Sequence, residues 1–443
     1  MADTEIQLWQ TVAPVEFSPK VKDKTEAQSL LIAARQGAGY QVAGGQVSHA
    51  LQNRATHVLM DYSQTACAIR YQIDGQWEQL PPIDRETGDA MLYALKQLAQ
   101  LNPADRRSAQ KGKIGAKLNK DKCDLTLQTQ GVPTGERVLI KIDLEKVPFE
   151  RLSDLGMRDK MVETFKTILN SDSNMVLVTA PKGGGLTTTW SIVLNVADKF
   201  VRDFQSFEDE DLAEPETINV NQNFFGGSTG MSLHERVRKA ILKEPDVFVF
   251  PETPDPETMK LAVDQVAGNE KQIITRAVAT SAIAGYVETL HRFPDQIGVL
   301  ADKTDAVLAQ KLVRRLCDQC KVGFQPPPQL LQQLGIPPGR VAELYQPFVL
   351  PPVEQQVDEQ GRPAPIEPCP ECNGRGYLGR VAIFELLRPG EQLKAAVKKS
   401  RDLGQLSQIA KSEGHKTLQA EAVLTVARGL TDLNELKRAF SGG

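Results

Sequence analysis

The sequence has little cysteine, no surplus of positive charge and no long apolar run. Six cysteines are too few for a disulfide scaffold in a chain of 443 residues. The formal net charge of -4 gives no basic field to attract nucleic acid or anionic lipid, so we expect neither as a partner. No apolar run reaches the roughly 20 residues that a membrane-spanning helix needs. The start, Met1-Ala-Asp-Thr-Glu, is acidic where a secretory signal is basic, and we therefore expect a cytoplasmic protein.

The composition is that of an ordinary globular protein with more than one domain. Hydrophobic residues make up 41% and charged residues 24% of the chain, and its length exceeds what one hydrophobic core supports. Changes of pattern along the chain predict five segments. These are a loose arm (1–24), an α+β domain (25–146), an α/β core (147–316), a cysteine-bearing segment with a proline-rich insert (317–388) and a helical C-terminal region (389–443).

The periodicity of apolar residues predicts two kinds of sheet. In the first domain, helical patterns cover 27–50 and 86–99, and strand patterns cover 57–62, 67–73, 75–80, 123–130 and 137–142. After residue 147, helices alternate with short apolar strands, which is typical of a parallel sheet covered on both faces. The expected strands of this sheet are 175–179, 204–207, 246–250 and 272–277.

Four of the cysteines form two C-x-x-C pairs, which indicate metal binding. Each tight turn can bring two sulfurs to one tetrahedral ion, and four thiolates with no open position predict a structural zinc site. Cys67 and Cys123 lie among apolar or β-prone neighbours and are predicted to be small buried hydrophobes. The expected zinc ligands are Cys317, Cys320, Cys369 and Cys372.

Residues 175–190 read as strand, glycine turn and helix start, which is the setting of a phosphate-binding loop. Glycines let successive backbone N–H groups face an anion, and the following helix N-terminus adds partial positive charge. Thr187 stands where a hydroxyl would hold magnesium. The candidate nucleotide-binding residues here are Lys182, Gly183, Gly184, Gly185, Leu186, Thr187 and Thr188.

This loop departs from the pattern G-x-x-x-x-G-K-[ST] at two positions, where Ala180 replaces the first glycine and Leu186 replaces the lysine. The lysine ammonium neutralises charge on the β- and γ-phosphates, and losing one such contact costs on the order of 100 to 1000-fold in rate. Lys182 could reach the phosphates from the other side of the loop. Alternatively, the glycine turn only joins strand to helix and no nucleotide binds.

Beyond the loop, the chain from about Ala55 to Phe440 resembles the ATPases of type II secretion and type IV pilus assembly. The most specific stretches are 70–75, 312–320 and 376–385, with weaker support from 414–418 and 429–431. The resemblance implies a RecA-like P-loop core preceded by a mobile PAS-like domain and assembled as a ring of six. It also implies ATP and magnesium between the two domains, and a membrane platform protein as the partner on which hydrolysis acts.

The family's catalytic motifs survive only in part. Glu208, in Phe207-Glu-Asp-Glu210, matches the carboxylate that assists hydrolysis. Glu252 matches the acid that polarises water or holds the magnesium shell, although a solvated loop acid is the equal alternative. Pro251 stands for a glycine and Pro254 for an arginine, and proline restricts the backbone on either side of Glu252.

Three basic positions of the family are altered as well. The arginine-bearing helix keeps Arg238 as a nucleotide-site residue but has Leu242 for its second arginine, and Val278 stands for the family's histidine. Arg106 and Arg107 match arginines that approach the nucleotide in the family, with solvated loop residues as the alternative reading.

Three functions follow from this pattern. The favoured one is a pseudo-ATPase, a structural or regulatory subunit that forms a homo- or hetero-hexamer with a catalytic paralogue and contacts the inner-membrane platform, so that it is peripheral at the membrane. The second is a working motor with Lys182 as a surrogate cation. The third is a sensor that binds ATP without hydrolysing it.

Overall fold

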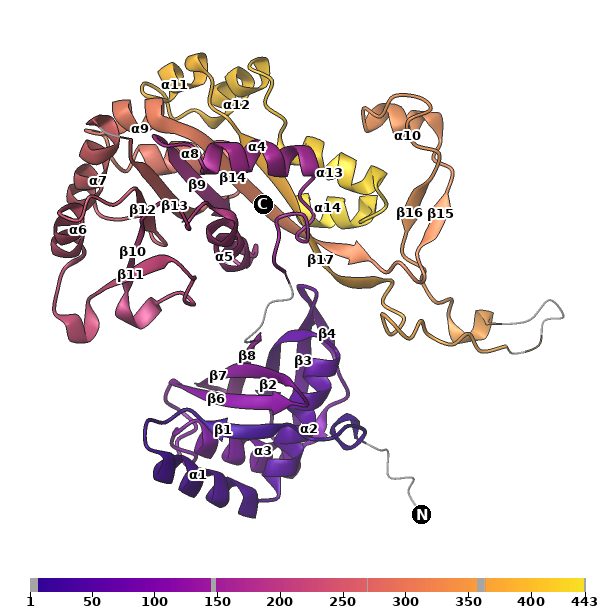
Figure 1. Ribbon diagram of the computed structural model, residues 1–443. Helices are drawn as coiled ribbons and strands as arrows, with labels where there is room; N and C mark the ends of the chain where they lie inside the picture. The colour runs from indigo at the N-terminus through magenta and orange to yellow at the C-terminus, as the bar shows by residue number, and fades with distance from the viewer. Residues whose placement is uncertain (1–6, 145–148, 269, 357–361, 363, 442–443) are drawn as a thin grey trace, which may run out of the picture. The chain divides into compact units, whose positions relative to one another are not determined.

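The computed structural model describes residues 7–144, 149–268, 270–356, 362 and 364–441 (Figure 1). The chain divides into two compact units, Met1–Pro148 and Phe149–Gly443. Among the described residues, no helix is both long and apolar enough to cross a bilayer.

The first unit is an antiparallel sheet in the order β1-β6-β7-β8-β2-β3-β4, with β5 paired to β3. Helices and strands share one core, as predicted for an α+β region, while the PAS-like assignment stays a prediction. The strands are β1 (Glu16–Pro19), β2 (Ala55–Tyr62), β3 (Ala66–Ile73), β4 (Gln76–Gln79), β5 (Ile83–Asp84), β6 (Gln110–Leu118), β7 (Asp121–Val132) and β8 (Gly135–Leu144). The helices are η1 (Leu8–Gln10), α1 (Lys24–Gln36), α2 (Gly39–Gln52) and α3 (Arg85–Leu98).

Two expectations for this unit are wrong. The described part of the predicted loose arm contains β1, which pairs with β6 and buries Phe17 in the core. The single helical pattern over 27–50 is two helices, α1 and α2, which meet around Gly37. Gly39 starts α2 against α3, because any Cβ there would lie 1.8 Å from the carbonyl oxygen of Ala90.

The second unit is built on a sheet in the order β11-β10-β12-β13-β9-β14-β17. Neighbouring strands are parallel except β17, which is antiparallel to β14. The predicted α/β class and the four predicted core strands are confirmed, as β9 (Met175–Ala180), β10 (Phe204–Asp209), β12 (Val247–Phe250) and β13 (Gln272–Val278). The unpredicted strands are β11 (Val220–Phe225), β14 (Thr304–Leu316) and β17 (Tyr377–Leu387), with a separate pair β15 (Val322–Phe324) and β16 (Leu344–Gln346).

Helices cover both faces of this sheet (Figure 1). Alternate side chains of β9 face different cores: Met175 and Leu177 belong to one apolar cluster, and Val176 and Val178 to the other. The helices are α4 (Asp159–Leu169), α5 (Leu186–Val196), α6 (Leu233–Ile241), α7 (Pro256–Gly268), α8 (Ala282–Leu290), α9 (Ile297–Lys303), α10 (Pro328–Gln333), α11 (Glu391–Val397), α12 (Leu403–Ser412), α13 (Leu418–Ala427) and α14 (Leu433–Ser441). Single 3-10 turns are η2 (Glu210–Leu212), η3 (Gly227–Thr229) and η4 (Val353–Gln355).

Candidate functional site

The candidate phosphate loop, residues 181–185, leaves the carboxyl end of β9 and enters α5. Gly183 and Gly185 have φ of +72° and +81°, which L side chains rarely adopt. At Gly184 a Cβ would lie 2.7 Å from the carbonyl oxygen of Pro181. The backbone therefore needs all three glycines, and the strand–loop–helix arrangement predicted from the sequence is present.

Gln310 of β14 holds this loop in place. Its buried side chain donates from Nε2 to the Gly184 carbonyl at 2.6 Å and accepts from the hydroxyl of Thr189 in α5. Sequence reasoning missed this residue. The only signal was a glutamine within the apolar run 306–313, where a buried amide needs partners.

The side chains around the loop differ in what they offer to an anion. Leu186 is half-buried and packs against the apolar cluster that contains Val178 and Trp190. Lys182 is exposed, and its ammonium has no ion pair or hydrogen bond to any residue that the structure describes. Thr187 is exposed and Thr188 is half-buried. The position of the usual lysine thus contributes to the core instead of carrying charge.

Glu208 belongs to β10, the second predicted strand of the core, and its side chain is buried. It is 5% exposed, and its carboxylate accepts from the Ser206 hydroxyl at 2.5 Å, the Glu214 N–H at 2.8 Å and Gln222 Nε2 at 3.1 Å. Three neutral donors therefore satisfy most of its acceptor capacity. Its role in hydrolysis stays a prediction.

Arg276 of β13 is a second residue that sequence reasoning missed, although an arginine inside the apolar run 273–278 was a signal. Its Nε donates to the Pro251 carbonyl at 2.6 Å, and its Nη2 forms an ion pair with Glu214. The guanidinium lies 5.4 Å from the ring centroid of Trp190 in α5. Arg276 thereby joins the phosphate-loop helix, the end of β12 and the segment that covers Glu208.

Glu252 is exposed, between the buried rings of Pro251 and Pro254. Within the described part of the chain its carboxylate has no hydrogen bond or ion pair, which agrees with the solvated alternative but leaves its role a prediction. The nearby Asp255 has a clear structural task instead. It caps α7 by accepting from the N–H and the hydroxyl of Thr258, at 3.0 and 2.6 Å.

The other predicted basic positions lie on the surface. Arg238 is exposed in the last turn of α6, Leu242 beyond it is 83% exposed, and Val278 is 54% exposed beside Ala180 of β9. In the first unit, Arg106 forms an ion pair with Asp89 at 2.8 Å. Arg106 and Arg107 line a cavity of about 740 Å³, and their predicted approach to nucleotide stays a prediction.

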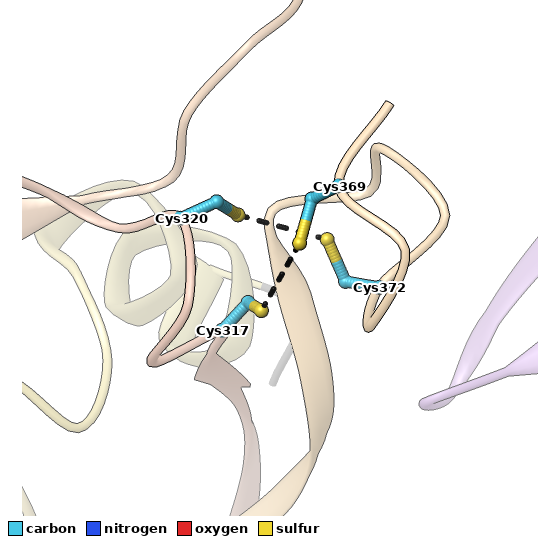
Figure 2. Close-up of side chains that lie close together, drawn as sticks. All are labelled: Cys317, Cys320, Cys369 and Cys372. Carbon is cyan, nitrogen blue, oxygen red and sulfur yellow. Dashed lines mark hydrogen bonds between the residues drawn. The ribbon is translucent and has the colours of Figure 1, made fainter. Parts of the chain in front are cut away.

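The four cysteines of the C-x-x-C pairs point toward one another (Figure 2). One pair follows the last residue of β14, and the other precedes β17, so that the two turns meet where these paired strands end. The sulfurs lie within 4.8 Å of one another, and the cluster could hold a metal ion. The separations of 3.9 Å for Cys317–Cys369 and 3.7 Å for Cys320–Cys372 are far longer than a disulfide bond.

Backbone N–H groups approach the sulfurs of two of these cysteines, Cys372 and Cys369. The N–H of Gly376 donates to the sulfur of Cys372 at 3.3 Å. The N–H of Cys372 lowers the pKa of Cys369 to about 7, against the effect of burial. This donor favours the thiolate of Cys369, which is the form that binds metal, whereas burial raises the pKa of Cys317 and Cys320. The leftover cysteines are buried as predicted, and burial raises the pKa of Cys67 to about 12.

Comparisons with known proteins agree on one family. The Type II/IV secretion system protein family matches residues 40–438. The chain is 26% identical to the type IV pilus assembly ATPase PilB of Thermus thermophilus, covering 88% of this chain and 42% of that protein. It is 24% identical to the type II secretion system protein E of Pectobacterium carotovorum, covering 96% and 80%.

The fold is shared with solved ATPase structures. The Legionella pneumophila ATPase DotB matches with a TM-score of 0.56 at 11% identity, covering 90% of this chain and 95% of that one. This likeness concerns the fold. The chain spans less than half the length of the Thermus relative and most of the length of the Pectobacterium one.

Proposed function

The chain belongs to the Type II/IV secretion system protein family, with pilus assembly and secretion ATPases among its relatives, and we propose that it serves such a machine as a structural or regulatory subunit with impaired catalysis. The observation that carries this proposal is the packing of the Leu186 side chain. A phosphate loop usually carries a lysine at this position. Here the leucine packs against the apolar cluster that contains Val178 and Trp190, on one face of the sheet. The backbone cradle is present while the cation that completes it is missing.

The acids around the loop support the same proposal. Glu208 is saturated by neutral donors, and Glu252 lies exposed between two prolines. Val278, at the family's histidine position, is an exposed apolar residue. Val278 lacks the imidazole of the family's histidine, and the carboxylate of Glu208 is already engaged by neutral donors, so slow turnover or none is expected.

Two alternatives rest on groups that remain near the loop. The exposed Lys182, with no ionic partner among the described residues, supports a motor that uses it as a surrogate cation. The three loop glycines and the exposed hydroxyl of Thr187 support a sensor that binds ATP with magnesium and does not hydrolyse it. In either case the loop N–H groups would hold the phosphates, and bound magnesium would offset their charge.

Measurements of phosphate release and of thermal stability on the purified protein distinguish the three functions. Steady release of phosphate from ATP would support the motor and contradict the proposal. Thermal stabilisation by ATP and magnesium without phosphate release would support the sensor. We expect neither a measurable turnover nor a large stabilisation.

We further propose that the chain works in a ring of six, alone or with a catalytic paralogue, beside an inner-membrane platform protein. Membership of the Type II/IV secretion system protein family supports this assembly, which the resemblance to secretion and pilus ATPases implies. A pull-down from native cells tests it, because a second ATPase with an intact phosphate loop should co-purify. Recovery of the chain without any such ATPase or membrane protein would argue against a mixed ring.

Zinc is the metal that we propose for the cysteine cluster. Metal–sulfur bonds of ~2.3 Å in a tetrahedron place sulfurs about 3.8 Å apart. The observed separations of 3.9 and 3.7 Å lie on either side of that value. Four cysteines leave no open position for a water or a substrate, so the ion would be structural. It would tie the start of β17 to the end of β14 across 48 intervening residues, 321–368.

Metal analysis of the native protein tests the zinc proposal, with one equivalent per chain expected. A chelator should lower the melting temperature of the wild type but leave that of a Cys317→Ser variant unchanged, because the variant has already lost the site. Equal chelator effects on both proteins, or a wild type without metal, would disprove it.

A further inference from the structure

The second unit contains a cavity of about 690 Å³ beside the sheet edge formed by β17. Part of its lining is apolar, from Met161 and Ile168 on one face of α4 and from Leu386 at the end of β17. The described lining contains no phenylalanine, tyrosine or tryptophan, and its one imidazole, His415, is buried, so it offers little surface on which a nucleobase could stack. The cavity suits aliphatic side chains better than a nucleotide.

Three cations surround this apolar lining without partners. Lys160, Arg388 and Lys416 are all exposed. Their charged side chains form no ion pair or hydrogen bond with a residue that the structure describes. Lys160 is in the first turn of α4, whose N-cap residue, Arg158, provides no side-chain cap. The partial positive charge of this helix end adds to the three cations.

The acids that line the cavity are already engaged. Glu421 forms an ion pair with Arg158 at 2.6 Å, Asp305 lies 3.7 Å from Lys394, and Glu413 accepts from a backbone N–H at 2.9 Å. His415, with 3% of its side chain exposed, also belongs to the lining, and its Nδ1 has no hydrogen-bond partner among the described residues. The lining holds four basic side chains, Arg158, Lys160, Arg388 and Lys416, against the three acids, so it is positive overall in a chain whose net charge is -4.

The complementary surface lies on the same chain, in residues 209–218. Leu212 and Ile218 are 63% and 71% exposed, although both are large aliphatic residues. Asp211 and Glu216 are exposed beside them, and their carboxylates have no ion pair or hydrogen bond to described residues. This acidic, aliphatic segment joins β10 to β11, so it lies at the opposite edge of the sheet from β17.

We propose that the segment 209–218 of one copy docks in the cavity of a second copy, with its aliphatic side chains on the apolar lining and its carboxylates at Lys160, Arg388 and Lys416. The two surfaces lie at opposite edges of one seven-stranded sheet and cannot meet within a chain. Their contact is heterologous, and such contacts propagate into a closed ring or a filament. The inference does not depend on whether the phosphate loop binds nucleotide.

Charge reversal tests this contact by sedimentation velocity of the full chain over a roughly hundredfold range of concentration. The triple variant Lys160→Glu, Arg388→Glu, Lys416→Glu and the double variant Asp211→Lys, Glu216→Lys should each weaken self-association by about tenfold or more. A mixture of the two variants should associate again, because each reversed surface then faces its opposite charge. Lys122→Glu, an exposed reversal on β7 of the first unit and so outside both surfaces, is the matched control and should change nothing.

The mixture of the triple and double variants tells whether the two surfaces contact each other. Recovery of association in the mixture, with both variants melting like the wild type, supports the contact. A wild type that stays monomeric throughout the range, or variants that associate as well as the control, would overturn it. Binding of the monomeric chain to an unrelated acidic peptide through the cavity would also overturn it, since the occupant would then be another protein.

Discussion

Among the single residues of the phosphate loop, Leu186 has exchanged an electrostatic role for a packing role. A lysine at this position would add positive charge next to the loop N–H groups, whereas the leucine contacts an apolar cluster on one face of the sheet. The glycines of the loop retain conformations that only glycine adopts without strain. The loop therefore has the backbone geometry that its glycines allow and an apolar side chain at position 186.

If Leu186 stands where a nucleotide-binding lysine would lie, as we propose, Leu186→Lys should raise the affinity for nucleotide. We expect ATP with magnesium to raise the melting temperature of this variant more than that of the wild type, with an affinity gain of about tenfold or more. Turnover should stay low, because the lysine does not restore the residues missing at Val278 and Leu242. Leu186→Met, which keeps the apolar packing without the charge, is the control, and an equal response of both variants would contradict the prediction.

Arg276 connects three elements through one guanidinium, and its removal should destabilise the second unit. Arg276→Ala would leave Glu214, whose side chain is 15% exposed, without its cation. We expect a loss of about 2 to 4 kcal/mol in the free energy of unfolding, measured by urea denaturation. Arg315→Ala removes the exposed pair with Asp318 and should cost no more than about 0.5 kcal/mol. Similar losses in the two variants would show that Arg276 contributes no more than a surface arginine.

Among the secondary-structure elements, α14 is fixed to β14 by a buried acid. Glu435 is fully buried and accepts from the Arg314 N–H at 2.9 Å and from Arg314 Nε at 2.8 Å, while Arg438 binds both of its oxygens. The same end of β14 leads into the first cysteine pair. The C-terminal helix and the cysteine cluster are thus anchored to the same strand.

This helix should detach in acid. Burial alone would raise the pKa of Glu435, but hydrogen bonds from Arg438 and Arg314 outweigh it and hold the pKa below the ordinary value of 4.5. A group with a lowered pKa stabilises the fold above its unfolded pKa, and this stability is lost as the pH falls below that value toward the folded pKa. The protection of the amides of residues 433–441 against hydrogen exchange, relative to the intrinsic rate at each pH, should therefore fall below about pH 4.5.

Glu435→Gln provides the comparison for this pH dependence. The variant should exchange faster than the wild type at neutral pH, and its exchange over 433–441 should change less with acid once the intrinsic rate is corrected. An identical pH profile in both proteins would assign the effect to another group.

Across the whole molecule, the two units have separate hydrophobic cores. Calorimetry of the full chain should show two unfolding transitions, because each unit has a hydrophobic core of its own. Chelation should lower only one of them, since all four clustered cysteines belong to the unit Phe149–Gly443. One cooperative transition, or an equal shift of both, would contradict independent folding.

Much of the fold followed from local pattern. The strands β9, β12 and β13 were predictable because each holds a short apolar run between helical segments, as parallel strands buried on both faces do, and β10 because Phe204 and Phe207 mark a short strand between such segments. The strands β1, β6 and β17 were not predicted. Their burial alternates or stops partway, so their strand character depends on the partner strand beside them.

The candidate site divides in the same way. The glycine loop, the leucine in place of the lysine and the two C-x-x-C pairs are properties of adjacent residues, and the sequence by itself determined them. The roles of Arg276 and Gln310 were decided only by the tertiary structure. Their partners Glu214 and Gly184 lie 62 and 126 residues away, and folding brings these groups together because buried polar atoms must find hydrogen-bond partners wherever the chain places them.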